Sequence, residues 1–399
     1  MAAAATAQQT SGRRWLVLAV ATFAQTAACA FVYGVPFLVP DLRDQFGLSL
    51  AAAGAYVAAP TAGLLTTLIL WGAAADRFGE RKVMASGLLL AALAVGVVGL
   101  TPGIDHGLVL ALLVVGGASA ASVFAACGRM IMGWFPRTER GLAMGIRQTA
   151  QPLGVAVAGL LLPGLAQRYG VFGALVVPAA LCLLAALLVI VAAPDPDRPP
   201  RTPGEHTSSP YRTPVLWRLH AASAMLVVPQ FAIGAFGAEY LVRQQGWSTT
   251  AAGAFVAVIQ IAGALGRIGS GVWSDRVGSR LRPMRQLAVG AALVLLTFAL
   301  GDAVAPWLAI AALVVGGVVT VADNGLAFTA VAEIAGPMWS GRALGVQNTG
   351  QNIVGSLTPV ALGALVGVAG YAVGFAVAAL APIAAIGLTP VRDEPDATW

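Results

Sequence analysis

Apolar stretches of about 20 residues, each long enough to cross a lipid bilayer, recur along this entire chain. Only 10% of its 399 residues are charged, whereas a soluble protein carries about 25%. Twelve such stretches can be placed, and the sequence therefore predicts an all-α membrane protein with twelve transmembrane helices. The predicted spans are residues 15–39, 50–73, 83–101, 107–134, 139–164, 170–193, 216–241, 249–273, 284–302, 305–330, 342–366 and 368–389.

One connection between spans differs from the others in length and composition. The segment "PDPDRPPRTPGEHTSSPYRTP", Pro194 to Pro214, is rich in Pro, Ser, Thr and charged residues, which is typical of an exposed linker. It divides the chain into an N-terminal six-helix bundle (1–193), a cytoplasmic linker (194–214) and a C-terminal six-helix bundle (215–399).

The distribution of arginine indicates the orientation in the membrane. With the N-terminus inside, the outer loops hold only Arg43, Arg168 and Arg243, and the other loop arginines lie in inner connections. The positive-inside rule then places both termini in the cytoplasm, and we expect a multi-pass protein of a bacterial cell membrane. Because the basic residues report topology, no nucleic-acid partner is expected.

The two halves of the chain contain matching motifs. "WGAAADRFGERK" from Trp71 aligns with "SGVWSDRVGSRLR" from Ser270 at an offset of 199 residues. "RGLAMGIRQTAQPLG" from Arg140 aligns with "SGRALGVQNTGQNIVG" from Ser340 at an offset of 200 residues. Six spans in each half make this a parallel repeat about an axis along the membrane normal.

These features together resemble the major facilitator superfamily. "GAAADRFGERK" between spans 2 and 3 matches its signature G-x-x-x-D-R-x-G-R-R/K apart from Glu80, and a degenerate copy lies between spans 8 and 9. The resemblance implies two pseudo-symmetric six-helix bundles and a secondary transporter that works by alternating access. It also implies a central cavity lined by spans 1, 4, 7 and 10, and a contact between Asp76 and the N-terminus of span 11. The residues assigned to this gating motif are Gly72, Asp76, Arg77, Gly79, Arg81, Asp275 and Arg276.

The signatures of drug/proton antiporters in this superfamily are incomplete here. Span 4 begins "LALLVVGGASAAS", without the arginine that those antiporters carry early in this span. Their G-P-x-x-G-G element in span 5 is matched only partly by "AQPLGVAVAG". Both departures weigh against drug efflux, while a proton-driven multidrug or metabolite efflux pump stays as the alternative function.

Ionisable residues inside membrane spans are costly and usually functional. The candidates are Arg129, Arg147, Glu239, Arg267 and Asp323. Arg129 lies near the inner face, and we interpret it as a structural partner of Asp76 or Glu139. Glu239 lies one turn before Arg243, so it is either half of a local i, i+4 pair or an outer gate that takes part in proton coupling.

Arg147 in span 5 and Arg267 in span 8 come from opposite halves. At 1.5 Å per residue they lie roughly 12 Å and 9 Å from the inner ends of their helices. Two arginines can clamp a carboxylate or phosphate group, so we predict an anion-binding site. Alternatively, Arg267 belongs to the latch of the loop between spans 8 and 9, or pairs with Asp323. Further candidate substrate-binding residues are Tyr33, Gln151, Gln260, Asn348 and Gln351.

Asp323 lies in "TVADNGLAF", within span 10. Removal from water favours the neutral form of a carboxyl group, so Asp323 is the candidate proton-coupling residue. Its alternative role is that of counter-ion to Arg147 or Arg267. The predicted function is therefore a proton-coupled permease, or symporter, for a small organic solute that is an anion. Its expected partners are this solute, protons and the lipid bilayer, and we expect a monomer without cofactor or metal.

The stretch "MGIRQTAQPLG" in span 5 carries the most specific of these predictions. Pro152 has no N–H group, which frees the carbonyl one turn before it for another donor. Against its repeat, Arg147 stands where the second half has the neutral Gln347. Arg147 is therefore the residue whose substitution is expected to tell most about the solute.

A membrane enzyme or a sensor has little support in the sequence. No span holds a Ser/His/Asp, paired-carboxylate or metal-ligand arrangement. The histidines His106, His206 and His220 lie in loops or near the ends of predicted helices.

Overall fold

The computed structural model describes residues 2–196 and 209–393, and within these ranges the chain is helical without strands. Eleven helical segments are long and apolar enough to cross a membrane. The first ten correspond one to one with predicted spans. The last, Ser340–Asp393, contains spans 11 and 12, because Gly370 at φ 83° and ψ 171° interrupts the helix between them. The prediction of twelve transmembrane helices is thereby confirmed.

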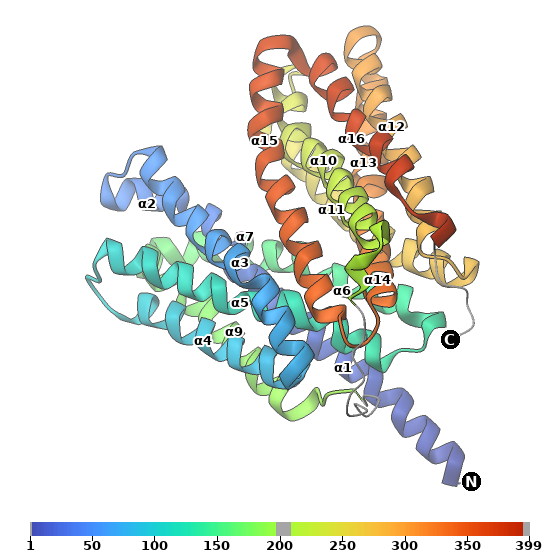
Figure 1. The fold of residues 1–399 in the computed structure, drawn as a ribbon. Coiled ribbons are helices and arrows are strands. Elements are labelled where there is room, and N and C mark those ends of the chain that lie inside the picture. Colours follow the sequence, from blue (N-terminus) through green and yellow to red (C-terminus); the bar gives the residue numbers. More distant parts are fainter. Residues whose placement is uncertain (1, 197–208, 394–399) are drawn as a thin grey trace. The chain divides into compact units, whose positions relative to one another are not determined.

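Apart from the linker between Ala192 and Pro214, the helices follow one another along the chain with short connections (Figure 1). The α-helices are α1 (Ala2–Val32), α2 (Val39–Phe46), α3 (Leu50–Phe78), α4 (Glu80–Leu100), α5 (His106–Trp134), α6 (Arg140–Gln148), α7 (Ala150–Tyr169), α8 (Val171–Ala174), α9 (Val176–Ala192), α10 (Pro214–Arg243), α11 (Thr249–Val277), α12 (Leu281–Val304), α13 (Pro306–Ala322), α14 (Asn324–Ala335), α15 (Ser340–Ala378) and α16 (Leu380–Leu388). The short 3-10 helices are η1 (Val35–Leu38), η2 (Arg137–Glu139), η3 (Pro210–Arg212) and η4 (Val391–Asp393).

The chain forms two compact units that differ slightly from the predicted halves. The first unit consists of Met1–Pro136, Thr149–Glu205 and Pro337–Val346, and the second of Arg137–Gln148, His206–Gly336 and Gln347–Trp399. Helix α6 thus packs with the second unit, and the first turns of α15 pack with the first. Residues 197–208 of the predicted linker lie outside the described part of the chain.

Three predicted spans are interrupted helices. Span 1 was predicted to run to residue 39, but α1 ends at Val32 and the prolines of "VPFLVP" begin the separate helices η1 and α2. Span 5 breaks at Thr149 between α6 and α7, and span 10 breaks at Asp323 between α13 and α14. The last two breaks lie beside the predicted site residues.

Close contacts between helix backbones hold the first unit together. Helix α3 packs closely on α5. A Cβ atom on Gly63 of α3 would lie 1.9 Å from the backbone oxygen of Val114. A Cβ atom on Gly117 of α5 would lie 1.9 Å from the backbone oxygen of Pro60. The carbonyl of Ala118 accepts hydrogen bonds across this contact from side chains of α3 at 2.7 Å. Small residues permit such approach in a membrane, where helix association depends on van der Waals packing.

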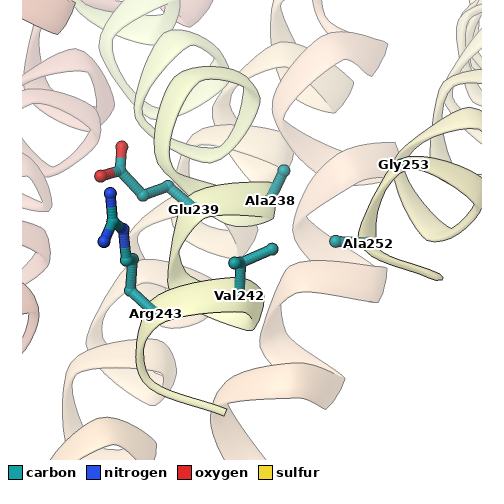
Figure 2. A pocket seen from close by; sticks show the side chains of 6 residues that line it. All are labelled: Ala238, Glu239, Val242, Arg243, Ala252 and Gly253. Atoms are coloured by element: carbon teal, nitrogen blue, oxygen red, sulfur yellow. The ribbon is translucent and has the colours of Figure 1, made fainter. Parts of the chain in front are cut away.

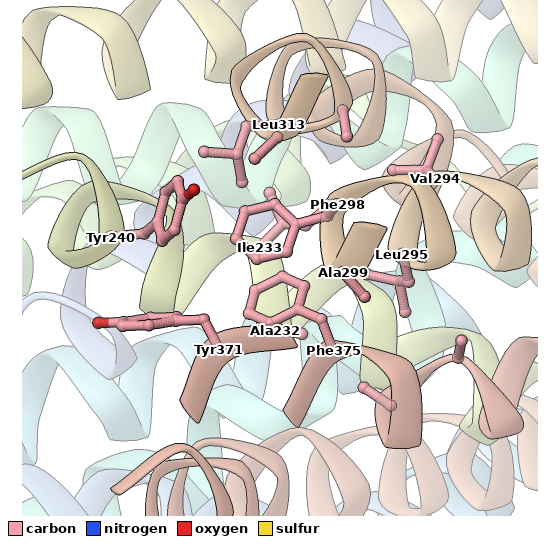
Figure 3. Close-up of a cluster of buried hydrophobic side chains, with 14 of the residues drawn as sticks. Ala232, Ile233, Tyr240, Val294, Leu295, Phe298, Ala299, Leu313, Tyr371 and Phe375 are labelled. Atoms are coloured by element: carbon pink, nitrogen blue, oxygen red, sulfur yellow. The ribbon is translucent and has the colours of Figure 1, made fainter. Parts of the chain in front are cut away.

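Aromatic rings form the centre of the second unit (Figure 3). Phe298 of α12 stacks on Phe375 with ring centroids 3.9 Å apart, and Tyr240 of α10 meets Phe298 edge-on at 4.7 Å. Tyr371 lies 5.2 Å from the ring of Tyr240. Such ring pairs are worth about 0.5–1.5 kcal/mol each beyond their buried area. The cluster therefore holds α10, α12 and the later part of α15 against one another.

Candidate functional site

Asp76, at the end of α3, joins two helices of the first unit. Its carboxylate accepts hydrogen bonds from the backbone N–H groups of Gly341 at 2.9 Å and Arg342 at 3.1 Å, and from Nε of Arg342 at 3.0 Å. These N–H groups belong to the first turn of α15, where the helix dipole favours a negative charge. The predicted contact between Asp76 and the N-terminus of span 11 is confirmed.

Glycines bring these two helices together. A Cβ atom on Gly72 would lie 2.3 Å from the backbone oxygen of Gly341, and one on Gly345 would lie 2.8 Å from that of Leu68. Gly341 and Gly345 form a G-x-x-x-G pattern, which brings one face of a helix close to a neighbouring backbone. The same spacing occurs in both repeats, at Gly141 and Gly145 in the first.

Arg129 is a structural partner of Asp76, as one of the two predicted alternatives has it. Its Nη1 lies 2.8 Å from Oδ1 of Asp76, and its Nε lies 3.0 Å from Oε1 of Glu80. Glu80, which departs from the family signature, is buried. Its carboxylate is one of the two that face Arg129. Paired burial of this kind is the condition under which a charge is tolerated inside a protein.

The remaining motif residues of the first unit lie at the turn between α3 and α4. Gly79 has φ 100°, a conformation that favours glycine, and the carboxylate of Asp195 occupies the space where its side chain would be. Asp195 also accepts from the backbone N–H of Arg81 at 2.7 Å, and thereby caps α4. Arg77 is exposed, with its guanidinium 5.2 Å from the ring centroid of Phe78.

The second unit repeats this arrangement around Asp275. The carboxylate accepts from the backbone N–H groups of Gly141 at 2.9 Å and Leu142 at 2.8 Å, which form the first turn of α6. Its arginine partner is Arg280 at 2.6 Å, whereas Arg276, which was assigned to the motif from the sequence, is exposed. The loop between α11 and α12 folds back at Gly278 and brings Arg280 to the carboxylate.

Glu333 of α14 extends this charged cluster. Its carboxylate lies 3.5 Å from both Arg140 and Arg280 and 3.9 Å from Arg137. Its three arginines come from separate segments, so the cluster ties η2, α6, the loop before α12 and α14 into one unit.

Arg267 has a contact that none of the sequence interpretations included. Its Nη1 donates to the backbone oxygen of Gln148 at 2.6 Å. This is the carbonyl that Pro152 leaves without an N–H partner, because proline four residues later has none to give. The predicted free carbonyl is confirmed, and Arg267 stabilises the break between α6 and α7.

Arg147 lies beside the same residue. Its side chain is only 1% exposed, and its Nη1 donates to Oε1 of Gln148 at 2.9 Å. The guanidinium lies 5.3 Å from the ring centroid of Phe328 in α14, within the range of a cation–π contact. The two arginines predicted to lie at similar depth therefore both contact Gln148, Arg147 through its side chain and Arg267 through its backbone.

Asp323 lies at the break in span 10 and is 3% exposed. In the described part of the chain no ion pair joins Asp323 to an arginine, although the charge of Arg267 acts on its carboxyl group. Its role as a counter-ion stays a prediction. Ser270 donates to the carbonyl of Ala322 at 2.6 Å and supports the break. Asn324 donates to Oε1 of Gln230 at 3.0 Å, which joins α14 to α10.

The other predicted substrate-binding residues are divided between the units. Tyr33 and Gln151 belong to the first, where the ring of Tyr33 meets Phe124 edge-on at 6.2 Å. In the second unit Asn348 is buried and Gln260 is exposed on α11. Gln351 donates to Oγ of Ser223 in α10 at 2.8 Å.

Glu239 lines a pocket of about 320 Å³ in the second unit. The pocket lies between α10 and the first turn of α11, and its lining includes Arg243, Ala252 and Gly253. Figure 2 shows the side chains of Glu239 and Arg243 pointing toward one another, one turn apart on α10. This is the placement that the predicted i, i+4 alternative requires.

His220 makes contacts that the sequence did not predict. It lies within α10, where Nδ1 of its ring is 2.6 Å from Oε1 of Gln347 and Nε2 is 3.0 Å from Oη of Tyr211. The available signal was Ser223, a polar side chain three residues further along the same helix. Only the folded chain brings Gln347 to it.

Comparisons with known proteins agree with this fold. A sequence profile of the Major Facilitator Superfamily matches residues 21–359. The chain is 42% identical to an uncharacterised MFS-type transporter of Mycobacterium tuberculosis over 386 residues, 96% of this chain and 86% of that protein. It is 28% identical to a probable sulfoacetate transporter of Cupriavidus necator, over 82% of this chain and 81% of that protein.

Among solved structures, the E. coli fucose:proton symporter superposes with a TM-score of 0.76 at 16% sequence identity, covering 95% of this chain and 98% of that chain. At this identity the match speaks for the fold alone. The helices, the repeated motif and these matches define a multi-pass membrane transporter. The chain belongs to the major facilitator superfamily.

Proposed function

We propose that this protein moves a small organic anion across a bacterial cell membrane together with protons, by alternating access. In this proposal the protein acts as a monomer. Both of its termini lie in the cytoplasm, as the arginines of the inner loops indicate. The observation that carries the proposal is the convergence of Arg147 and Arg267 on Gln148 inside membrane-spanning helices. Two guanidinium groups around one residue create a positive region that attracts an anion.

The two arginines have different tasks in this proposal. Arg267 holds the break between α6 and α7 and thereby fixes Gln148. Arg147 supplies the charge and the N–H donors for a carboxylate or sulfonate group of the solute, for which its planar guanidinium is suited. The resemblance to a probable sulfoacetate transporter supports an anionic solute of this kind.

Asp323 is the proposed proton carrier. Its carboxyl is buried at a helix break of the same unit, with Arg267 as the charge that acts on it. Binding of an anion near Arg267 weakens the stabilisation of the ionised carboxylate, which favours uptake of a proton at Asp323. Proton and anion then bind together, as a symporter requires.

Uptake into proteoliposomes tests this function. The purified chain is reconstituted, and uptake of radiolabelled sulfoacetate and of neutral fucose is measured with and without an inward proton gradient. We expect accumulation of the anion driven by the gradient and none of fucose. Accumulation of fucose without sulfoacetate would contradict the anionic solute, and equal sulfoacetate uptake without the gradient would contradict proton coupling.

Variants locate the anion site in the same assay. Arg147→Gln, which installs the residue of the second repeat, should lower sulfoacetate uptake about tenfold or more, since hydrogen bonds to charged groups contribute about 1.5–3 kcal/mol. Arg168→Gln at the outer end of α7 removes an equal charge and should leave uptake unchanged. Asp323→Asn should retain exchange of the anion and lose accumulation by the gradient. Full transport by Arg147→Gln would refute the proposed site.

A further inference from the structure

A chain of hydrogen bonds connects η3, α10 and α15 in the second unit. Tyr211 contacts Nε2 of His220 at 3.0 Å, and Nδ1 of His220 contacts Oε1 of Gln347 at 2.6 Å. The amide nitrogen of Gln347 donates to Oγ of Ser223, and Nε2 of Gln351 donates to the same oxygen at 2.8 Å. Ser223 and Gln347 are fully buried. We call these five side chains the α10–α15 network.

His220 in this network can hold a second ring proton without losing a partner. Neutral imidazole donates from one nitrogen and accepts at the other, whereas imidazolium donates from both. Oε1 of Gln347 is an acceptor, and the hydroxyl of Tyr211 can donate or accept. Burial raises the pKa of Tyr211 to about 12, so it stays a phenol. The hydrogen-bond partners of His220 therefore suit both of its protonation states.

Two aromatic rings lie beside His220, and that of Tyr211 is near enough to favour a positive charge on it. The ring of Tyr211 stacks on the imidazole with centroids 5.9 Å apart and an interplanar angle of 23°. Trp217 lies edge-on at 6.4 Å. The negative face of an aromatic ring attracts a cation within about 6 Å of its centroid. Tyr211 thus offers both a hydroxyl acceptor and a ring face to the imidazolium.

Arg218, the charged residue of α10 nearest to His220 in sequence, is engaged elsewhere. On the same helix, Arg218 contacts Asp393 at 3.3 Å and the carbonyl of Gly387. The other charged or titratable groups on α10 and on the elements packed against it are Arg212, Glu239, Tyr240, Arg243, Arg267, Asp275, Arg276, Arg282, Arg285, Asp302, Asp323, Glu333 and Tyr371. Over residues 2–196 and 209–393, the hydrogen bonds of the His220 ring go to Tyr211 and Gln347. Its charge state therefore acts on the network first.

We propose that His220 is a proton-binding, positioning residue whose ionisation sets the orientation of the Gln347 amide. When both ring nitrogens donate, Gln347 must turn Oε1 to His220, and its NH₂ group then donates to Ser223. When the neutral ring carries its proton on Nε2, the reversed amide satisfies the same contacts. Protonation of His220 thus decides whether the hydroxyl hydrogen of Ser223 is donated to Gln347 or is left for another acceptor, and in this way changes the polar groups beside Gln351. The transport effect rests on the proposed function, while the proton site itself does not.

Nitrogen NMR of the full-length protein in nanodiscs tests the proton site without any solute. The chain has three histidines, so signals are assigned with His106→Gln, His206→Gln and His220→Gln variants. We expect Gln347→Ala to move the His220 titration to lower pH by about 0.7 units, the equivalent of one hydrogen bond of about 1 kcal/mol. Asn352→Ala, which removes a side-chain amide one turn further on α15, should not move it. An unmoved titration in Gln347→Ala overturns the inference.

Exchange of sulfoacetate at equal pH on both sides of the membrane tests the transport effect. The wild-type rate should vary between about pH 5 and 8, and His220→Gln should reduce that variation about threefold or more. His106→Gln, in the first unit, should keep the wild-type profile. A wild-type profile in His220→Gln overturns the positioning role and leaves the proposed function intact. If the wild-type protein exchanges no sulfoacetate, the proposed function fails, and the NMR titration still decides whether His220 binds the proton as inferred.

Discussion

The two repeats that begin at Arg140 and Ser340 are built alike in their first two turns and differently at their eighth residue. Gly141 of the first and Gly341 of the second each lie against the backbone of a glycine in another helix. Further along, Arg147 and Gln347 are both buried, but one carries a charge beside Phe328 and the other a neutral amide bonded to His220. In both halves the duplicated motif thus forms a close helix crossing. The halves differ in the buried side chain that follows, which is charged in the first and neutral in the second.

Adding one carbon at the crossing should have the largest effect. A Cβ on Gly271 would lie 2.1 Å from the backbone oxygen of Gly141, whereas Gly269 on the same helix has open space. Gly271→Ala should therefore destabilise the protein by about 3 kcal/mol, at the upper end of overpacking costs. Gly269→Ala should stabilise it slightly, because alanine favours helix by up to about 1 kcal/mol. Thermal unfolding in detergent measures both.

The same experiment on the first repeat sharpens the comparison. Gly72 faces the backbone oxygen of Gly341 at 2.3 Å from its ideal Cβ position, and Gly54 of the same helix has open space. Gly72→Ala should lose as much stability as Gly271→Ala, with Gly54→Ala as its control. Unequal losses would show that the two crossings are not equivalent.

Placing a charge in the second repeat should have the next largest effect. Gln347→Arg puts a guanidinium at a position that is 1% exposed and breaks the hydrogen bonds to His220 and Ser223. We expect a loss of about 2–3 kcal/mol, since buried polar groups left without partners cost this much. Gln347→Met, of similar size, separates the charge from the lost bonds. A stable Gln347→Arg protein would show that the second repeat tolerates the charge of the first.

Neutralising the two motif aspartates should give a smaller and unequal effect. Among the described residues Asp76 has more arginine donors than Asp275, because Arg129 and Arg342 both reach Asp76 whereas Arg280 reaches Asp275. Asp76→Asn should cost about 2 kcal/mol and Asp275→Asn about 1 kcal/mol, since each charge-assisted hydrogen bond exceeds a neutral one. Denaturant or thermal unfolding of the two variants gives the difference. The reverse order would contradict this ranking.

The smallest predicted effect concerns the helix break at Thr149. Arg267→Ala leaves the carbonyl of Gln148 without its donor and should cost about 1 kcal/mol. In a Pro152→Ala background the new N–H group can bond the same carbonyl, so the cost of Arg267→Ala should shrink toward zero. A double-mutant cycle on unfolding temperature measures this coupling. Equal costs in both backgrounds would assign Arg267 another role.

Much of the fold could be predicted because membrane helices have a strong local signal. Length and hydropathy located the twelve spans, and the offset of 200 residues identified the repeat. The contact of Asp76 with the start of α15 also followed, through the family resemblance. The interruption of span 1 was not predicted, because hydropathy does not register the prolines at which η1 and α2 begin.

The candidate site was predicted only in part. Arg147, Arg267 and Asp323 were found because a buried charge is conspicuous in an apolar span. Their partners were not, since Arg267 bonds a backbone carbonyl and Asp323 has no ion pair in the described chain. A carbonyl freed by proline is visible in the sequence, but the donor that reaches it comes from a helix more than 100 residues away.

The sequence by itself determined that this chain crosses a membrane twelve times, in two related halves of a major facilitator transporter. Those properties depend on the period and polarity of neighbouring residues. The tertiary structure alone decided that Arg280 and not Arg276 reaches Asp275, that two arginines meet at Gln148, and that His220 faces Gln347. These contacts join helices far apart in the chain, and their geometry depends on how closely the glycines let the helices pack.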